Sequence, residues 1–140
     1  MSEFRTNVFP VHRYRNAPAA IDWLCKVFGF ERHAVYEDDN GTIAHAELTL
    51  GNGMIMLGSQ CDDEYGRGFK SPEDLGGVET RSLYIVVPDA DAAHARAVAA
   101  GAVVVRPLQD MPYGSREFSV KDPEGHMWSV GTYDPWAKHE

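Results

Sequence analysis

Apolar residues follow a helical period in one stretch near the N-terminus. The i, i+3, i+4 and i+7 positions of one helical face are occupied by Ile21, Leu24, Cys25 and Phe28. Asn16 precedes this stretch as a candidate N-cap, Pro18 falls in the first turn, and Gly29 is placed to terminate it. The pattern therefore predicts a helix between Asn16 and Gly29, with Cys25 as a small core residue.

Each half of the chain shows the order strand, helix and three strands. In the first half, the apolar stretch from Asn7 to Tyr14 precedes the helix, and strand segments follow near 32–36, 42–50 and 54–58. In the second half, an alternating segment over 82–87 precedes an alanine-rich helix that begins at Pro88-Asp89, runs to Ala100 and is closed by Gly101. Three strand segments follow, over 103–106, 116–121 and 126–132. The shared order indicates an internal duplication, with module one over about 6–58 and module two over about 81–134.

The hairpin in the first half has one apolar face and one mixed face. Gly51-Asn52 is a two-residue turn, and it pairs Leu48 with Ile55 and Ala46 with Leu57. The side chains of the opposite face are His45, Glu47, Thr49, Met54 and Met56. We expect a helix to cover the apolar face and the mixed face to border a wetter space.

A long segment without periodicity separates the two modules. Residues 59–80 are rich in glycine and acidic side chains and show neither helical nor strand spacing. A loop of this length is uncommon in a small domain unless it has a function or is disordered. We expect a mobile flap over a cavity, with disorder as the alternative.

Composition and charge exclude several kinds of partner. The chain of 140 residues has a net charge of −8, whereas binding to nucleic acid or to an anionic membrane surface calls for a basic face. No apolar run approaches the roughly 20 residues of a membrane span. Two cysteines are too few for a disulfide framework, and the N-terminus has no apolar signal core. We therefore expect a cytoplasmic protein without nucleic-acid or membrane partners.

Three motifs resemble those of the vicinal oxygen chelate superfamily, which includes glyoxalase I, fosfomycin-resistance proteins, extradiol dioxygenases and bleomycin resistance proteins. They are the first helix with its end at 20–30, the third and fourth strands from His45-Ala46-Glu47-Leu48 to Ile55-Met56-Leu57, and the closing hairpin Asp122-Pro123-Glu124-Gly125-His126-Met127-Trp128-Ser129. The resemblance covers nearly the whole chain. It implies an α+β fold of paired βαβββ modules, which form an open, cup-shaped mixed β-sheet with the helices on the outside, and a homodimer.

The resemblance also indicates where a metal would be bound. Metal-dependent members hold a divalent ion through His, Glu or Gln side chains on several strands. Carried over by motif, those positions fall on Phe9, Met56, Ser82 and Ser129. Since a phenyl ring and a thioether do not hold a hard cation, we expect neither the usual metal centre nor another cofactor.

Four ionisable residues remain as candidates for chemistry. His45 and Glu47 are two residues apart on one strand, so they share a face and could bind a metal, act as an acid–base pair or form a hydrogen bond in a polar cavity. Glu117 is the other candidate base. Arg13, if it points inward, needs a partner, which could be Glu47, Glu117 or an anionic group of a ligand.

The expected function is the binding or sequestration of a small organic ligand, in the manner of the metal-free antibiotic-binding members. Aromatic and methionine side chains offer contact surface to a flat or apolar ligand. The candidate ligand-binding residues are Phe9, Arg13, His45, Glu47, Met56, Tyr84, Glu117, Ser119 and Ser129. Two alternatives remain open: a metal-dependent lyase, isomerase or dioxygenase with non-standard ligands such as His45 and Glu47, and a metal-free acid–base enzyme with Glu47 or Glu117 as the base.

Overall fold

The computed structural model describes residues 6–137, which form two modules of the same topology. Module one consists of β1 (Val11–Tyr14), α1 (Ala17–Phe28), β2 (Glu31–Glu37), β3 (Ile43–Leu50) and β4 (Gly53–Ser59). Module two consists of β5 (Leu83–Val86), α2 (Ala90–Ala99), β6 (Val103–Asp110), β7 (Arg116–Lys121) and β8 (Met127–Gly131). The strands form two four-stranded mixed sheets, in the orders β1-β4-β3-β2 and β5-β8-β7-β6. The predicted α+β fold of paired βαβββ modules is confirmed. Within residues 6–137, neither helix is long and apolar enough to cross a membrane.

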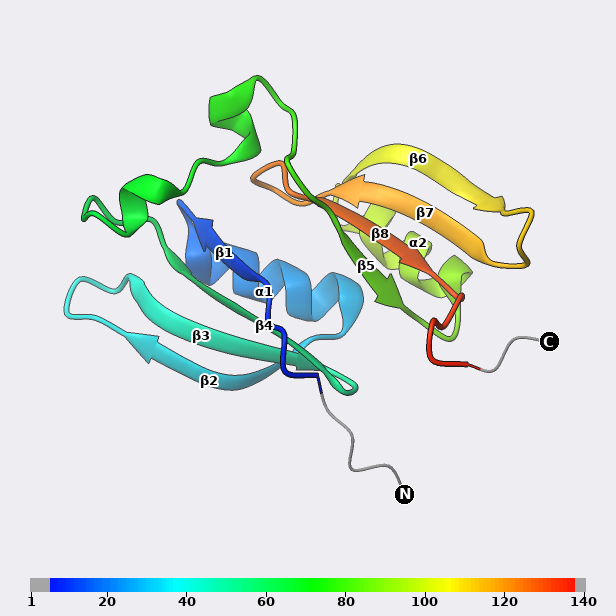
Figure 1. Cartoon of the computed structure of the whole chain (residues 1–140), viewed down its shortest axis with the longest axis horizontal. Coiled ribbons are helices and arrows are strands. Elements are labelled where there is room, and N and C mark those ends of the chain that lie inside the picture. Colours follow the sequence, from blue (N-terminus) through cyan, green and yellow to red (C-terminus); the bar gives the residue numbers. More distant parts are fainter. Residues whose placement is uncertain (1–5, 138–140) are drawn as a thin grey trace.

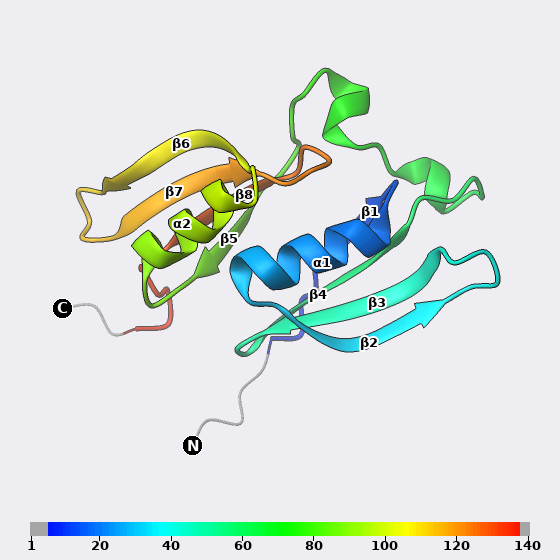
Figure 2. The ribbon, with the colours of Figure 1, turned by 180° about the vertical axis from the view of Figure 1, so that it is seen from behind.

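Both helices lie on the same side of the two sheets. They are behind the strands in Figure 1 and in front of them in Figure 2. Between the modules, the side chain of Arg81, which lies just before β5, donates a hydrogen bond to the carbonyl of Val11 in β1 over 3.2 Å. We call the helix-free side of each sheet its open face. Since side chains alternate along a strand, the open face of module one carries Val11, Arg13, His45, Glu47, Thr49, Met54 and Met56. The open face of module two carries Tyr84, Val86, Glu117, Ser119, Met127 and Ser129.

The first helix begins and ends as its sequence predicts. The Asn16 side chain accepts a hydrogen bond from the backbone N–H of Ala19 over 3.1 Å. Gly29 ends the helix in the left-handed conformation at φ 85°, and its N–H donates to the carbonyl of Cys25. A side chain other than glycine would be strained at that φ, so Gly29 fixes the direction in which the chain leaves toward β2.

Two strand boundaries differ from the sequence prediction. The first strand begins at Val11 rather than Asn7, so Phe9 lies outside it. Pro10 has no N–H to donate, although its carbonyl still accepts a hydrogen bond from Met56. The strand predicted to end at Arg106 continues to Asp110 as β6, because its pairing with β7 resumes beyond an irregularity. The second helix ends at Ala99, one residue earlier than predicted.

The hairpin between β3 and β4 has the predicted register. Leu48 pairs with Ile55 and Ala46 pairs with Leu57, and all four side chains are buried in the core cluster that includes the buried face of α1. The core continues from module one into module two through Trp128, which is 1% exposed and packs against Phe28 and Phe30. The helix-side faces of the two sheets thus share one apolar core, which fixes the modules relative to each other.

A polar cluster joins β1 to the turn between β7 and β8. The Tyr14 hydroxyl donates to Asp122 Oδ2 over 2.7 Å, and the Trp128 indole donates to the same oxygen over 3.1 Å. Glu124 accepts hydrogen bonds from the backbone N–H groups of Arg15 and Asn16. The closing hairpin of module two therefore caps the start of α1 in module one.

The segment between the modules has more structure than its sequence indicates. It contains two 3-10 helices, η1 (Gly66–Gly68) and η2 (Pro72–Leu75), and the second has a capping box formed by Ser71 and Asp74. At its end, Glu79 Oε2 lies 3.1 Å from His126 Nδ1. Local hydrogen bonds thus order the chain at the second of these helices, where no hydrophobic period exists. The flap over a cavity stays a prediction.

Candidate functional site

A groove of about 820 Å³ lies between the two modules. It is bordered by the tip of the β3–β4 hairpin, by β5 and by residues of the segments 6–10 and 134–136. Its lining includes the apolar side chains of Met54, Ile55, Val86 and Trp128 together with the Tyr84 ring. Its volume lies within the roughly 300–1,000 Å³ typical of small-molecule sites. The groove can therefore hold a small organic molecule with an apolar or aromatic body.

His45 and Glu47 lie together on the open face of module one, as their spacing predicts. His45 Nε2 is 2.9 Å from Glu47 Oε2, and the Tyr36 ring of β2 stacks on His45 at 6.2 Å between centroids. His33 Nε2 is 3.9 Å from the other carboxylate oxygen. Because both side chains of the His45–Glu47 pair are only partly buried, they can hydrogen-bond to a ligand or exchange a proton with it.

Arg13 lies on the same open face but does not pair with either carboxylate considered for it. Glu47 contacts His45 and His33, and Glu117 contacts Arg106. Arg13 Nη1 instead donates to the Ser59 carbonyl over 3.1 Å. Its guanidinium lies 5.2 Å from the Tyr65 ring centroid and 5.7 Å from that of Phe69. These cation–π contacts attach the segment between the modules to the open face.

Glu117 is the carboxylate on the open face of module two, and it is 4% exposed. Arg106 Nη2 lies 3.3 Å from its Oε1, and the Tyr113 hydroxyl donates to its Oε2 over 2.9 Å. The hydrogen bond to Glu117 raises the pKa of Tyr113 above its usual value. Both oxygens of Glu117 thus have donors, which hold Arg106 and Tyr113 beside it. A role of Glu117 as a base stays a prediction.

Beside Glu117, two serines form a smaller polar contact. The hydroxyls of Ser119 and Ser129 lie 2.8 Å apart on neighbouring strands. The Tyr84 hydroxyl donates to the Tyr133 carbonyl over 2.7 Å, so the Tyr84 ring is oriented toward the C-terminal segment. These groups form a polar surface next to the apolar groove.

Gly131 provides the space in which Glu117 and Tyr84 pack. A Cβ at this position would lie 2.5 Å from Glu117 Cγ and 2.8 Å from the Tyr84 hydroxyl oxygen. We expect Gly131→Ala to displace both side chains and to lower the free energy of unfolding by about 1–3 kcal/mol, as overpacking does. Urea denaturation measures the change.

Gly68→Ala is the matched control for this substitution. Nothing lies within 4 Å of a Cβ at Gly68, and its φ is not positive. We expect a change below about 1 kcal/mol there. Equal effects of the two substitutions would show that the space at Gly131 is not required.

The side chains at the four carried-over metal positions do not fit a divalent ion. Phe9 and Ser82 lie just before β1 and β5, and Met56 and Ser129 lie on the open faces. A phenyl ring supplies no ligand atom, a thioether is a soft donor, and the Ser129 hydroxyl is engaged with Ser119. Across residues 6–137, no three His, Cys, Asp or Glu side chains gather in a group that could hold a metal.

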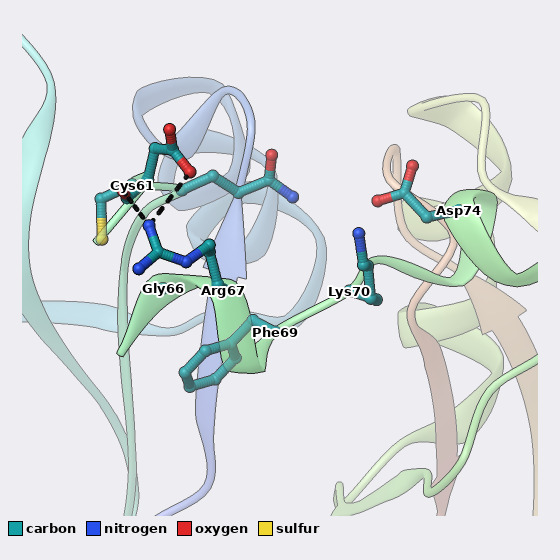
Figure 3. Close-up of a pocket in the computed structure, with 8 residues that line it drawn as sticks. Cys61, Gly66, Arg67, Phe69, Lys70 and Asp74 are labelled. Atoms are coloured by element: carbon teal, nitrogen blue, oxygen red, sulfur yellow. Dashed lines mark hydrogen bonds and ion pairs between the residues drawn. The ribbon is translucent and has the colours of Figure 1, made fainter. Parts of the chain in front are cut away.

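A smaller hollow of about 360 Å³ lies in the segment between the modules (Figure 3). Arg67 borders it and donates to the carbonyl of Asp62 over 2.7 Å. Lys70 and Asp74 lie on its other side, and Cys61 and Phe69 complete its wall. None of the candidate ligand-binding residues lines this hollow, which is formed within the segment itself.

The candidate ligand-binding residues fall into two groups, one for each module. Arg13, His45, Glu47 and Met56 lie on the open face of module one, with Phe9, 39% exposed, just before β1. The open face of module two carries Tyr84, Glu117, Ser119 and Ser129. Of the nine, Tyr84 alone is part of the lining of the groove.

Sequence reasoning missed Arg106, Tyr65 and Phe69 as neighbours of the candidate residues. Arg106 is a charged residue directly after the run Val103–Val105, and that break in an apolar segment is a signal for an inward ion pair. Tyr65 and Phe69 carry no comparable signal, because they reach Arg13 only through the path of an aperiodic segment.

Comparisons with known proteins agree with this architecture. The family model of the Glyoxalase/Bleomycin resistance protein/Dioxygenase superfamily matches residues 11–130 of this chain. TioX from Micromonospora sp. ML1 is 34% identical, and the alignment covers 89% of this chain and 98% of TioX with a TM-score of 0.66. The uncharacterized protein Mb0911c of Mycobacterium bovis is 34% identical over 116 residues, which are 83% of this chain and 76% of that protein.

A more distant structure shares the fold alone. The fosfomycin resistance protein FosX from Mesorhizobium loti is 16% identical, with 96% of each chain covered and a TM-score of 0.65. The match of the superfamily to most of the chain, and the shared arrangement of paired modules, lead to one conclusion: the chain belongs to the glyoxalase/bleomycin resistance protein/dioxygenase superfamily.

Proposed function

We propose that the protein binds and sequesters a small organic ligand, without a metal, in the groove and on the adjoining open faces. The observation that carries this proposal is the groove of about 820 Å³, which is lined by apolar and aromatic side chains and bordered by a few polar groups. Such a lining binds a ligand by apolar contact, while hydrogen bonds from a small number of polar atoms orient it. FosX is named as a fosfomycin resistance protein, and an antibiotic is one kind of ligand that we propose here.

A library of small aromatic compounds, read out by thermal shift, tests the proposal. A ligand present at about a hundred times its Kd adds about 2.7 kcal/mol to the stability. For a domain of this size that corresponds to a rise in Tm of about 5–10 °C. Mass spectrometry of small molecules extracted from the purified protein gives an independent measurement.

Two matched variants locate the binding. Val86→Arg places a charge in the groove, whereas Val98→Arg makes the same substitution on the exposed surface of α2. We expect Val86→Arg to abolish the thermal shift and Val98→Arg to leave it unchanged. A ligand that stabilises both variants equally binds outside the groove, which contradicts this location.

The proposed absence of a metal is tested by elemental analysis of protein purified without chelator and without a polyhistidine tag. We expect much less than one equivalent of zinc, nickel, iron or manganese for each chain, because Phe9, Met56, Ser82 and Ser129 supply no suitable ligand set. About one bound metal ion for each chain, lost together with ligand binding on chelation, would overturn this part of the proposal.

Acid–base catalysis is the second candidate function. The hydrogen bond of 2.9 Å between His45 and Glu47, on a partly exposed open face, is the observation that favours it. Compounds identified in the library are incubated with the protein and analysed for products. Turnover that is lost in Glu47→Gln would make this function primary.

We also propose that the protein is a cytoplasmic homodimer. Val35, Tyr36 and Val104 expose apolar surface on its strands, and β2 and β6 are sheet edges. A second copy that covered such surface would remove apolar area and free edges from water. Light scattering coupled to gel filtration should give about twice the chain mass of 15.5 kDa, and a monomer would contradict this proposal.

A further inference from the structure

Arg13 has hydrogen-bonding capacity that the protein itself does not use. A guanidinium carries five N–H donors, and Arg13 donates to one acceptor, the Ser59 carbonyl. Its Nε is buried and has no hydrogen-bond partner. Within residues 6–137, no carboxylate lies within 4.0 Å of the Arg13 guanidinium, since Glu47 and Glu117 pair with other side chains. Asp63 is near enough for the charge of Arg13 to help lower the pKa of Asp63, but it forms no ion pair with Arg13 and accepts hydrogen bonds from Gly66 and Cys61. Nη2 also has no acceptor among the described residues but, unlike Nε, it is not buried, so its N–H groups are available to an anion.

The surroundings of Arg13 are shaped to hold its guanidinium in place. Gly58 is paired with Arg13 across β1 and β4, and a Cβ on Gly58 would lie 2.6 Å from Arg13 Nη1. The Tyr65 and Phe69 rings lie at 5.2 and 5.7 Å from the guanidinium carbon. The glycine therefore provides space beneath the guanidinium, and the two rings restrict its motion without using its N–H donors.

An apolar surface adjoins this cation on the same open face. Val11 is two residues before Arg13 on β1, and Met56 is two residues before Gly58 on β4, so the Val11–Met56 pair is the next one along the open face. Two residues of a strand span about 7 Å, which is close to the length of a small aromatic ring system. Arg13 and this pair together offer one charged contact and one apolar contact.

We propose that Arg13 selects ligands that carry an anionic oxygen group, a carboxylate or a phosphate, attached to an apolar body that lies over Val11 and Met56. This inference rests on the proposed binding function and names the chemical class of the ligand. A guanidinium forms charge-assisted, bidentate hydrogen bonds with either group. The net charge of −8 disfavours the approach of anions to the protein as a whole, so a positioned cation on the open face gives selectivity as well as affinity.

A matched pair of probes tests the inference. Binding of 2-naphthoate and of 2-naphthamide, which share a ring system and differ in charge, is measured by calorimetry on the full chain near neutral pH. Inorganic phosphate is a third probe and distinguishes phosphate recognition from carboxylate recognition. We expect 2-naphthoate to bind roughly tenfold or more tightly than the amide, as a charge-assisted hydrogen bond provides.

Variants assign the selectivity to Arg13. In Arg13→Gln the preference for the carboxylate over the amide should fall to about one, and in Arg13→Lys, which keeps the charge without the fork, it should be intermediate. Arg13→Met keeps the apolar stem beneath Tyr65 and Phe69 and replaces Arg13→Gln if that variant does not fold. Arg32→Gln removes the same charge from an arginine that pairs with Asp22 of α1, and it should leave the preference unchanged.

Each other result overturns the inference. The first such result is equal affinity for the carboxylate and the amide in the wild-type protein. The second is an unchanged preference in a folded, neutral Arg13 variant, and the third is no binding of either anionic probe. Any of them would mean that Arg13 only attaches the segment that carries Tyr65 and Phe69. Failure of the proposed function gives a different result. In that case, no library compound produces a thermal shift that Val86→Arg abolishes. Amide binding with no carboxylate preference would leave the binding function intact.

Discussion

Replacing Asp122 by alanine is expected to lower the free energy of unfolding by about 3–5 kcal/mol. The Asp122 carboxylate is 5% exposed and accepts four hydrogen bonds, from the Tyr14 hydroxyl, the Trp128 indole and the backbone N–H groups of Glu124 and His126. Each buried donor that loses its acceptor costs about 1–3 kcal/mol, and water recovers part of the loss. Because these donors belong to both modules, the variant should also loosen their junction. Urea denaturation followed by tryptophan fluorescence measures the change.

Two further substitutions separate the role of Asp122 from a general effect of charge. Asp122→Asn keeps one carbonyl oxygen, so it should cost less, about 1–2 kcal/mol. Asp110→Ala removes an exposed carboxylate that pairs with Arg116, and such a surface pair contributes less than about 1 kcal/mol. If Asp122→Ala were no more destabilising than Asp110→Ala, the junction would not depend on this carboxylate.

Acidification should destabilise the protein through His12. The pKa of His12 is lowered from 6.5 to about 3 by burial and, to a smaller extent, by the neighbouring His126 and Arg81. The unfolded chain therefore binds a proton at His12 more readily than the folded chain does. The corresponding stability is fully present above about pH 6.5 and falls by about 1.4 kcal/mol for each pH unit below it, down to the folded pKa near 3.

The environment of His12 explains why it stays neutral. Its ring is 3% exposed, stacks on His126 at 4.2 Å between centroids and meets the edge of Trp128. The Tyr14 hydroxyl donates its only hydrogen to Asp122. In the contact of 3.1 Å between His12 Nδ1 and the same hydroxyl, His12 Nδ1 is therefore the donor. A second proton on His12 would place a charge next to His126 and Arg81, away from water.

Comparison of His12→Gln with the wild-type protein isolates this titration. Burial also raises the pKa of Asp122. On acidification this shift favours the folded state, whereas the shift of His12 disfavours it. Because Asp122 is present in both proteins, its contribution cancels in the comparison. Between about pH 7.5 and pH 5, the wild-type protein should lose about 2 kcal/mol more stability than His12→Gln. His33→Gln, at an exposed site, should follow the wild type. Parallel pH profiles for His12→Gln and the wild type would show that His12 is not held neutral by the fold.

The helices, the hairpin register and the superfamily resemblance could be predicted from the sequence because each depends on local information. A helix period with a cap at Asn16 and a glycine at Gly29 specifies α1 without reference to distant residues. The two-residue turn at Gly51-Asn52 sets which residues of β3 and β4 face each other. Strand alternation then assigns His45 and Glu47 to one face, and they do form a hydrogen bond there.

The partners of the candidate residues were decided only by tertiary structure. Arg13 could pair with Glu47, with Glu117 or with a ligand as far as its sequence position indicates. The path of the aperiodic segment brings Tyr65 and Phe69 over it, while Arg106 reaches Glu117 from β6. His12 becomes a buried neighbour of His126 through contacts between residues more than a hundred positions apart. Periodicity and turn chemistry specify which face a side chain occupies, but its partner across the fold depends on how the two modules and the segment between them pack, which no local pattern encodes.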